Sequence, residues 1–208
     1  MTNCYGPHYR RHEYQDRQSM LREQYGFRCV CRACSDPADR VYMQSFTAVQ
    51  CQACSGPVLD NRCQECQASC EQSQVNTRVL DNCHDIVKLR QLEQSWSKVL
   101  YKHHQSLAEA RDRLAKLELE EGNIEECVRL LELGLEYTEA RYGEDSVEMG
   151  HELMKYSDVL FIQLQHGGKS LDKLSEALHK ANRIFTLQNG FESKVCREIG
   201  EKIKLIKS

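Results

Sequence analysis

The cysteines are the residues whose types and spacing point most directly to chemistry. Of the twelve cysteines in this 208-residue chain, ten lie within the first 83 residues. Four of them form the pattern Cys51-x-x-Cys54 and, eight residues later, Cys63-x-x-Cys66. A C-x-x-C turn directs two thiolates at one point, and a second such turn a short loop away completes a tetrahedron around zinc. The spacing therefore predicts a four-thiolate zinc site.

A second cluster contains three cysteines, in the pattern Cys29-x-Cys31-x-x-Cys34. Its C-x-x-C pair also favours a metal, but three sulfurs leave a tetrahedral zinc one ligand short. We therefore expect zinc here as well, with a fourth ligand from elsewhere. Cys4 is a local alternative for that ligand.

A disulfide scaffold is the competing interpretation of so many cysteines. The first residues show neither the basic segment nor the apolar stretch of a secretory signal, so we expect an intracellular protein, cytoplasmic or nuclear. In such a reducing compartment C-x-x-C pairs usually bind metal or perform redox chemistry, and no βαβ unit of the thioredoxin type is predicted. Zinc is therefore favoured. The other cysteines are expected to be ordinary thiols (Cys70 and Cys83, with Cys70 an alternative ligand of the Cys51 site) or core residues (Cys127 and Cys196).

Composition divides the chain near residue 72. All three prolines precede that point, and the residues after it are rich in Leu, Glu, Lys, Gln and Ala, which favour helices. The net charge of −3 gives no basic signature of a nucleic-acid-binding protein. No apolar run approaches 18 residues, so no membrane span is expected. We expect three segments: 1–35, 36–72 and 73–208.

Residues 46–67 are expected to form a zinc ribbon that folds around its metal. Phe46 to Val49 is a strand-like run, Gly56-Pro57 favours a turn, and Asp60-Asn61 suits a hairpin tip. Between the outer cysteines of this ribbon only Arg62 is basic and no residue is aromatic. Contact with nucleic acid is therefore disfavoured, and a structural zinc is predicted.

From about residue 73 onward apolar residues recur at helical spacing. Val79 to Val87 mark a first helix and Leu100 to Leu117 a second. Four more helices follow, separated by stops at Gly122-Asn123, Tyr142-Gly143, Gly167-Gly168 and Asn189-Gly190.

This alternation of helix and glycine indicates a degenerate repeat. It resembles tetratricopeptide-like (TPR-like) hairpins with a period a little longer than the usual 34 or so residues. Such hairpins stack, because none can bury its apolar face alone. The predicted fold class is mainly α, with TPR-like helical hairpins C-terminal to a small zinc-stabilised irregular or β segment. A plain helical bundle without a binding role is the alternative. The histidines lack metal-ligand partners and are expected at the surface or at caps (His103, His104, His151, His166 and His179).

Three aromatic residues lie close to the three-cysteine cluster in the sequence. A short amphipathic helix over residues 17–25 is predicted to stop at Gly26. It places Tyr25 and Phe27 immediately before the metal loop, and Tyr5 precedes a predicted turn at Gly6-Pro7. On composition alone, these aromatics are most simply core residues packed against a zinc knuckle.

A family resemblance changes the interpretation of these aromatics. Asn3 to His8, Arg17-Gln18 and Gln24 to Cys34 resemble the end of the SET domain and the post-SET motif of the SET and MYND domain-containing proteins. These are protein-lysine methyltransferases that use S-adenosyl-L-methionine (AdoMet). Ser146 to Leu153 points within that family to its fourth-numbered member.

The resemblance implies a role for each aromatic. Tyr5 would face the transferred methyl group and line the cofactor pocket, Tyr25 would line the channel for the target lysine, and Phe27 would lie against the adenine of AdoMet. Methyl transfer mainly requires alignment and exclusion of water, which an aromatic channel supplies. Such a channel can also hold a cation over its ring faces.

The sequence also departs from the family pattern. In the family an Asn-His-x-Cys motif supplies the fourth ligand of the post-SET zinc, and neither an Asn-His pair nor a Gly-x-Gly occurs here. The MYND finger is missing as well. We therefore expect a C-terminal portion of a methyltransferase, whether a truncated product or a reused piece, that is inactive without the rest of the SET domain. Its helical part would help to wall the substrate cleft.

The alternative function is a non-catalytic, zinc-stapled helical adaptor that binds protein partners. For the polypeptide on its own the adaptor is favoured, because catalysis needs a preorganised site. In either case the expected partner is a protein, a substrate or another partner, bound through the helical C-terminal domain.

Overall fold

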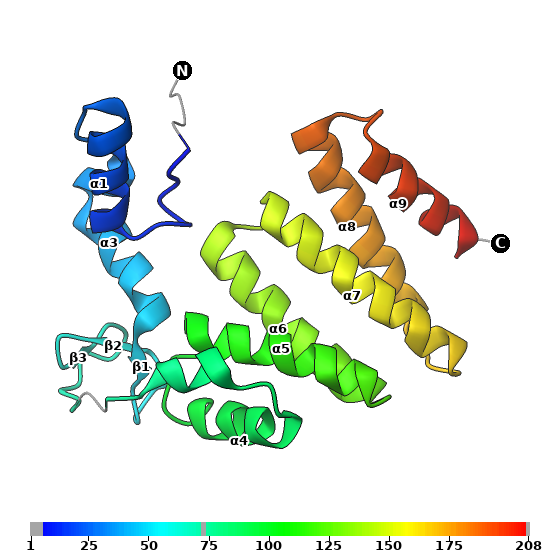
Figure 1. The fold of residues 1–208 in the computed structure, drawn as a ribbon, viewed down its shortest axis with the longest axis horizontal. Helices are drawn as coiled ribbons and strands as arrows, with labels where there is room; N and C mark the ends of the chain where they lie inside the picture. The colour runs from blue at the N-terminus through cyan, green and yellow to red at the C-terminus, as the bar shows by residue number, and fades with distance from the viewer. Residues whose placement is uncertain (1–5, 72–73, 207–208) are drawn as a thin grey trace. The chain divides into compact units, whose positions relative to one another are not determined.

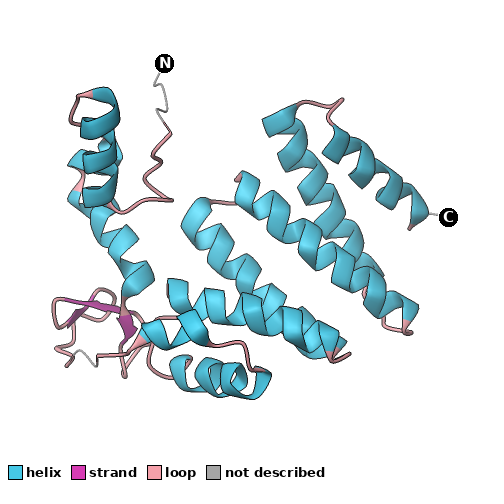
Figure 2. Cartoon of the chain, viewed as in Figure 1, coloured by secondary structure: helices cyan, strands magenta, loops and turns pink. Residues whose placement is uncertain are grey.

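A computed structural model describes residues 6–71 and 74–206, so the predictions for Cys4 and Tyr5 lie outside the described residues. The chain divides into two compact units (Figures 1 and 2). The first comprises Met1–Gln74 with Val99–His104, and the second comprises Val75–Lys98 with Gln105–Ser208. Helices dominate and the sheet is small, so the predicted mainly α fold is confirmed. The functional division at residues 35 and 72 stays a prediction.

The first unit starts with three helices. They are α1 (Tyr14–Tyr25), α2 (Arg32–Ser35) and α3 (Pro37–Gln44). Helix α1 ends as predicted at Gly26, whose φ of 70° lies in the left-handed region that glycine tolerates. Asp36 begins α3, because its side chain accepts a hydrogen bond from the Ala38 N–H at 2.9 Å.

A small antiparallel sheet follows, built from β1 (Val49–Gln50), β2 (Pro57–Leu59) and β3 (Arg62–Cys63) in that order. Val58 is the centre of its register, opposite Val49 on one side and Cys63 on the other. The predicted hairpin tip at Asp60-Asn61 is confirmed. Both residues have positive φ, 49° and 60°, as a two-residue turn needs to match the twist of its strands.

Two local predictions for this segment were wrong. Residues Ser45–Thr47 form a 3₁₀ turn (η1) rather than a strand, and this turn buries Phe46 to 1% exposure. Pro57 does not make the turn either, because it opens β2, where a first-position proline needs no ladder N–H. The turn lies instead within the first C-x-x-C loop.

Val99–His104 belongs to the first unit and consists of turns around a single β-bridge at Leu100. The Gln50 N–H donates to the Val99 carbonyl at 2.8 Å, and the Tyr101 N–H donates to the Ala48 carbonyl at 3.0 Å. Leu100 therefore pairs with β1 and does not belong to the second helix, contrary to the prediction. His104 was also expected at the surface, yet it is buried to 5% exposure.

All the regular elements that the structure describes in the second unit are helices. Its elements are η2 (Thr77–Asn82), α4 (Ile86–Trp96), α5 (Gln105–Glu120), α6 (Ile124–Tyr142), α7 (Val147–Gln165), α8 (Leu171–Asn189) and α9 (Lys194–Leu205). The first predicted helix is therefore two elements. Asp85 separates them, because its side chain accepts the Lys88 N–H at 2.8 Å and starts α4 afresh.

Helices α5 to α9 follow the predicted stops closely, and each packs on the next along the chain (Figure 1). Ion pairs also join every second helix: Asp112–Lys155 links α5 to α7, Asp158–Lys202 links α7 to α9, and Glu132–Lys173 with Glu139–Lys180 links α6 to α8. The first helices of successive hairpins, α5, α7 and α9, begin at residues 105, 147 and 194. The repeat is therefore more than 40 residues long, longer than predicted.

The core of this unit is apolar, and it buries Cys127 and Cys196 as predicted. Within the part of the chain that the structure describes, none of the helices combines the length and apolarity needed to span a bilayer.

Candidate metal centres

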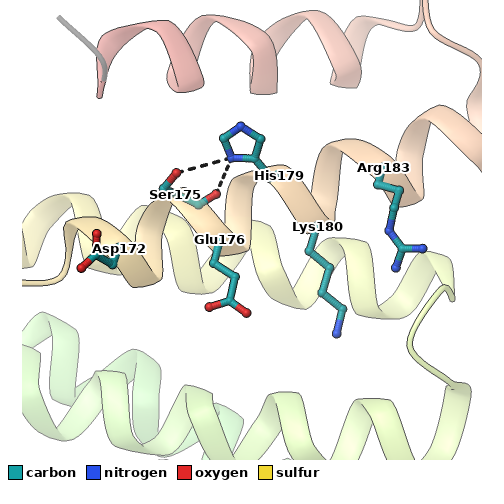
Figure 3. Close-up of a pocket in the computed structure, with 6 residues that line it drawn as sticks. All are labelled: Asp172, Ser175, Glu176, His179, Lys180 and Arg183. Atoms are coloured by element: carbon teal, nitrogen blue, oxygen red, sulfur yellow. Dashed lines mark hydrogen bonds between the residues drawn. The ribbon is translucent and has the colours of Figure 1, made fainter.

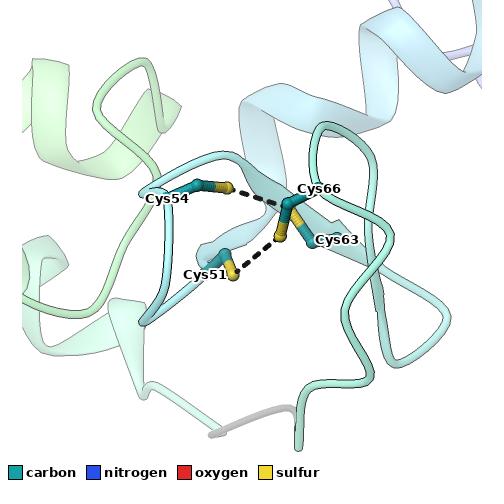
Figure 4. A group of neighbouring side chains, drawn as sticks. All are labelled: Cys51, Cys54, Cys63 and Cys66. Carbon is teal, nitrogen blue, oxygen red and sulfur yellow. Dashed lines mark hydrogen bonds between the residues drawn. The ribbon is translucent and has the colours of Figure 1, made fainter.

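The ribbon brings four thiols to one point. The sulfurs of Cys51, Cys54, Cys63 and Cys66 all lie within 4.8 Å of one another (Figure 4). The Cys51 and Cys66 sulfurs are 3.7 Å apart, and those of Cys54 and Cys63 are 3.4 Å apart. Zinc–sulfur bonds of about 2.3 Å in a tetrahedron require sulfurs roughly 3.8 Å apart. The four thiols therefore fit a zinc ion.

The two C-x-x-C loops of this ribbon have the same backbone pattern. In the first loop, the Ser55 N–H donates to the Cys51 carbonyl at 2.8 Å, and the Cys51 N–H donates to the Gly56 carbonyl at 2.8 Å. The residue after the second cysteine is left-handed in each loop, with φ of 62° at Ser55 and 61° at Gln67. The second loop repeats both bonds at 3.1 and 3.0 Å through Gln67, Cys63 and Ala68. Two equivalent knuckles thus face one another across the site.

Backbone amides and neighbouring thiols together shift the pKa values of the ribbon thiols. The N–H groups of Ala53 and Cys54 lower the pKa of Cys51 to about 6. The pKa of Cys54 is raised to about 12, because the thiols of Cys63 and Cys66 and burial outweigh the N–H of Gly56. One thiolate is stabilised while its crowded neighbours resist ionisation. A divalent cation removes that conflict, because a coordinated thiol ionises.

Cys70, the alternative ligand, lies at the edge of this site. Its sulfur is 3.7 Å from that of Cys51, and it packs against the small core formed with Val58. It is not one of the four mutually close thiols, so Cys51, Cys54, Cys63 and Cys66 remain the better tetrahedral set.

The three-cysteine cluster is also assembled. The sulfurs of Cys29, Cys31 and Cys34 lie within 4.8 Å of one another, and Cys31 and Cys34 are 3.6 Å apart. Cys31 begins α2, and its carbonyl accepts the N–H groups of Cys34 and Ser35. Among the described residues no fourth His, Cys, Asp or Glu joins the group. Burial raises the pKa of Cys34 to about 11, against the lowering effect of Arg17.

Two polar side chains of α1 hold this cluster. The Gln18 amide bonds both backbone groups of Cys29, and the Arg17 guanidinium donates to the Cys34 sulfur at 3.0 Å. In the sequence these two residues belong to the SET-like motif, and no role was predicted for them. Both precede Leu21, the apolar residue that α1 buries, by three or four positions, which places all three on one side of the helix. This spacing was the one sign in the sequence that Arg17 and Gln18 are buried.

Several known proteins of one name are similar to this chain over most of its length. No family model matches the chain. It is 28% identical to "Protein-lysine N-methyltransferase SMYD4" of Mus musculus over 97% of this chain and 27% of that protein. It is 28% identical to the Homo sapiens protein of the same name, over 91% of this chain and 26% of that protein. It is 26% identical to the Danio rerio protein of that name, over 97% of this chain and 30% of that protein.

The chain is therefore similar to SMYD4 proteins over nearly its whole length. The resemblance to the SET and MYND domain-containing family, and within it to the fourth-numbered member, is confirmed. The chain spans only about a quarter of the length of the curated SMYD4 proteins that it matches.

The aromatic residues expected from the SMYD resemblance flank the turn at Gly26. Tyr25 is the last residue of α1 and is 49% exposed, and Phe27 is half-buried directly before the cysteine loop. Tyr5 lies outside the described residues. Tyr25 and Phe27 therefore precede the Cys29 cluster by a few residues along the chain, and the roles of all three aromatic residues stay predictions.

The surface hollows of the helical unit include two that its long helices line. One, of 610 Å³, is lined by α5, α6 and α7 and includes the acids Glu109, Asp112, Glu148 and Glu152 with Lys155. The other, of 530 Å³, lies along α8, where the Ser175 carbonyl and His179 Nδ1 are 2.7 Å apart (Figure 3). In neither hollow do described residues form a group of three close metal ligands.

Proposed function

We propose that this chain is part of an AdoMet-dependent protein-lysine N-methyltransferase of the SMYD type, working in the cytoplasm or nucleus. It supplies the end of the SET domain, the post-SET zinc centre and a helical substrate-binding domain. One observation carries this proposal: a chain that aligns with SMYD4 proteins over 91–97% of its length brings together three thiols in the loop that follows Tyr25 and Phe27 in the sequence.

The zinc ions have a structural role in this proposal. Cys51, Cys54, Cys63 and Cys66 hold one, and Cys29, Cys31 and Cys34 hold the other with a ligand from the SET core. Small ribbons gain most of their folding free energy from metal, and the three-stranded sheet here has only seven residues in its strands. The second zinc fixes the loop that follows Tyr25 and Phe27.

The aromatic residues align the reactants in this proposal. AdoMet, when bound, supplies a methyl group on a sulfonium. Phe27 offers a ring face for its adenine, Tyr25 lines the passage of the lysine side chain, and the Tyr5 hydroxyl faces the methyl group. The ring of Tyr25 is 49% exposed and can hold the lysine ammonium by cation–π attraction until the amine loses its proton.

A protein-interaction adaptor is the second candidate function. The 610 Å³ hollow favours it, because three consecutive helices build that hollow without any part of the cysteine unit. Its lining mixes acidic side chains with Arg141 and Lys155, so a partner segment with polar and charged side chains would suit it. In the methyltransferase the same surface would contact the substrate away from the target lysine.

The proposal is tested by joining this chain to a SET segment of a SMYD4 relative that carries Asn-His-x-Cys and Gly-x-Gly. We expect calorimetry to detect no AdoMet binding by the chain alone, and we expect binding and methyl transfer by the joined protein. Tyr5→Phe should strongly reduce turnover with the fold intact, whereas Tyr9→Phe, the matched loss of one hydroxyl, should not. Phe27→Ala should weaken AdoMet binding by about 1–3 kcal/mol.

Two results would refute this proposal. Methylation by the chain alone would show that it is an autonomous enzyme. A joined protein that holds both zinc ions yet neither binds AdoMet nor transfers methyl groups would leave the adaptor as the better assignment.

A further inference from the structure

We propose that Arg17 and Gln18 of α1 position the Cys29–Cys31–Cys34 zinc centre. Gln18 fixes the backbone of the first ligand, and Arg17 balances the charge at the last. The inference rests on the zinc centre of the proposed function and adds the residues that hold it.

Gln18 clamps Cys29 at two points. Its Oε1 accepts the Cys29 N–H at 3.0 Å, and its Nε2 donates to the Cys29 carbonyl at 2.8 Å. The side chain is only 9% exposed, so water competes weakly for these bonds. A carboxamide bonded on both sides fixes the rotation of the Cys29 backbone. The clamp thereby sets the direction from which the Cys29 thiolate enters the cluster.

Arg17 is a buried positive charge beside the cluster. It is 3% exposed, and its Nη2 donates to the Cys34 sulfur at 3.0 Å, where Cys34 is 6% exposed. Across residues 6–71 and 74–206 its Nε finds no hydrogen-bond partner, and no carboxylate pairs with the guanidinium. A buried charge is costly unless a counter-charge lies next to it.

A zinc-loaded cluster provides that counter-charge. Three thiolates around Zn²⁺ carry a net charge of about −1, by the ligand chemistry of zinc. The guanidinium neutralises that charge, and its N–H bond to sulfur supports the ligand in the way that outer-shell donors do. The burial of Arg17 is therefore explained by the metal-bound state of the cluster.

The composition of α1 supports this role. The helix buries three residues, Arg17, Gln18 and Leu21, and two of them are polar. A helix docked only to cover a core would bury an apolar stripe instead. Consecutive helix positions point about 100° apart, so neighbouring residues can reach opposite ends of the cysteine loop.

The test is a zinc competition measurement on the full chain. A chelator is titrated against zinc-loaded protein with a coloured zinc indicator, and the ribbon serves as internal reference. Arg17→Met and Gln18→Leu should each weaken zinc binding at the Cys29 centre by about 10–100-fold, with the ribbon step unchanged. Arg22→Met and Gln24→Leu, which alter exposed residues of the same helix, should move neither step.

A conservative variant separates charge from packing. Arg17→Lys keeps the charge and should retain zinc much better than Arg17→Met, even if the methionine variant disturbs α1. If Arg17→Lys and Arg17→Met lose zinc equally, the charge role is wrong. Absorption of the cobalt-loaded protein then reports whether three thiolates still bind the metal.

The outcomes also separate this inference from the proposed function. Two release steps in the wild type that Arg17→Met and Gln18→Leu leave unmoved would overturn the inference and spare the zinc centre. A wild type that holds zinc only in the ribbon would overturn both the post-SET zinc centre and this inference.

Discussion

Gly150 tests how tightly the helical unit is packed. It lies in α7, where an added Cβ would be 2.9 Å from Cζ of Phe185 and 3.2 Å from Cγ2 of Ile184. Both neighbours belong to α8 and are at most 1% exposed, so neither can move aside into solvent. The close approach of α7 and α8 therefore depends on the absence of a side chain at residue 150.

Two opposing effects set the size of the change in Gly150→Ala. Alanine gains about 1 kcal/mol over glycine inside a helix. Overpacking a dense core costs about 1–3 kcal/mol. Because the contacted atoms lie on buried, well-packed side chains, we expect the clash to exceed the gain. The free energy of unfolding should fall by about 1 kcal/mol, which lowers the Tm by roughly 2–8 °C.

Gly200→Ala is the matched control for this prediction. Gly200 lies inside α9, and an added Cβ would meet nothing within 4 Å. This substitution should therefore stabilise the chain by about 0.5–1 kcal/mol. Thermal unfolding of both variants, followed by the helical circular dichroism signal, measures the difference. A Gly150→Ala protein as stable as the wild type, or as stable as Gly200→Ala, would refute the packing of α7 on α8.

Three further predictions concern the first unit, which holds both cysteine clusters and His104. Cys63→Ser should lower the zinc content by one equivalent and leave helicity nearly intact, because the helices have their own core. The control Cys70→Ser should keep both zinc ions. Elemental analysis measures the zinc, and an unchanged zinc content in Cys63→Ser would contradict the ribbon assignment. A chelator should remove zinc from the Cys29 centre before it removes zinc from the ribbon, since only three described thiols form the Cys29 centre. A single release step for both zinc ions would mean that a local residue such as Cys4 completes the Cys29 centre as a fourth thiolate. Burial lowers the pKa of His104 to about 4, although a backbone hydrogen bond to Thr47 acts to raise it. Below about pH 6.5 the unfolded chain therefore binds more protons at this residue than the folded chain does. As the pH falls from about 6.5 to 4, the wild type should lose up to about 3 kcal/mol relative to His104→Gln, and parallel stability profiles would contradict a buried neutral imidazole.

The sequence predicted those features of the fold that depend on local chemistry. Gly26, Gly122 and Gly190 end helices because each adopts a positive φ that other residues avoid, and Asp60-Asn61 turns the hairpin for the same reason. The cysteine spacings likewise predicted both thiol clusters, since each C-x-x-C loop is a local structure.

The features that depend on distant partners could not be predicted. Leu100 follows helical spacing in the sequence, yet its backbone pairs with β1, some fifty residues earlier. His104 lies in the same segment, Val99–His104, and is buried, and the residues around it in the sequence do not indicate that burial. Asp85 was a readable exception, because an aspartate before an apolar run is a helix-start signal.

The positioning residues of the metal centre show the same limit. Arg17 and Gln18 are polar and would normally be assigned to a solvated helix face. Only the folded chain reveals that both are buried against the cysteine loop.

X-ray absorption at the zinc edge of the purified, reduced chain is the most direct test of the two metal centres. We expect two zinc ions per chain, with zinc–sulfur distances of about 2.3 Å and, on average, between three and four sulfurs per zinc. Four sulfurs come from the ribbon thiols, and three from the Cys29 cluster with one lighter ligand. A chain without zinc, or zinc bound mainly by oxygen and nitrogen, would contradict both metal centres.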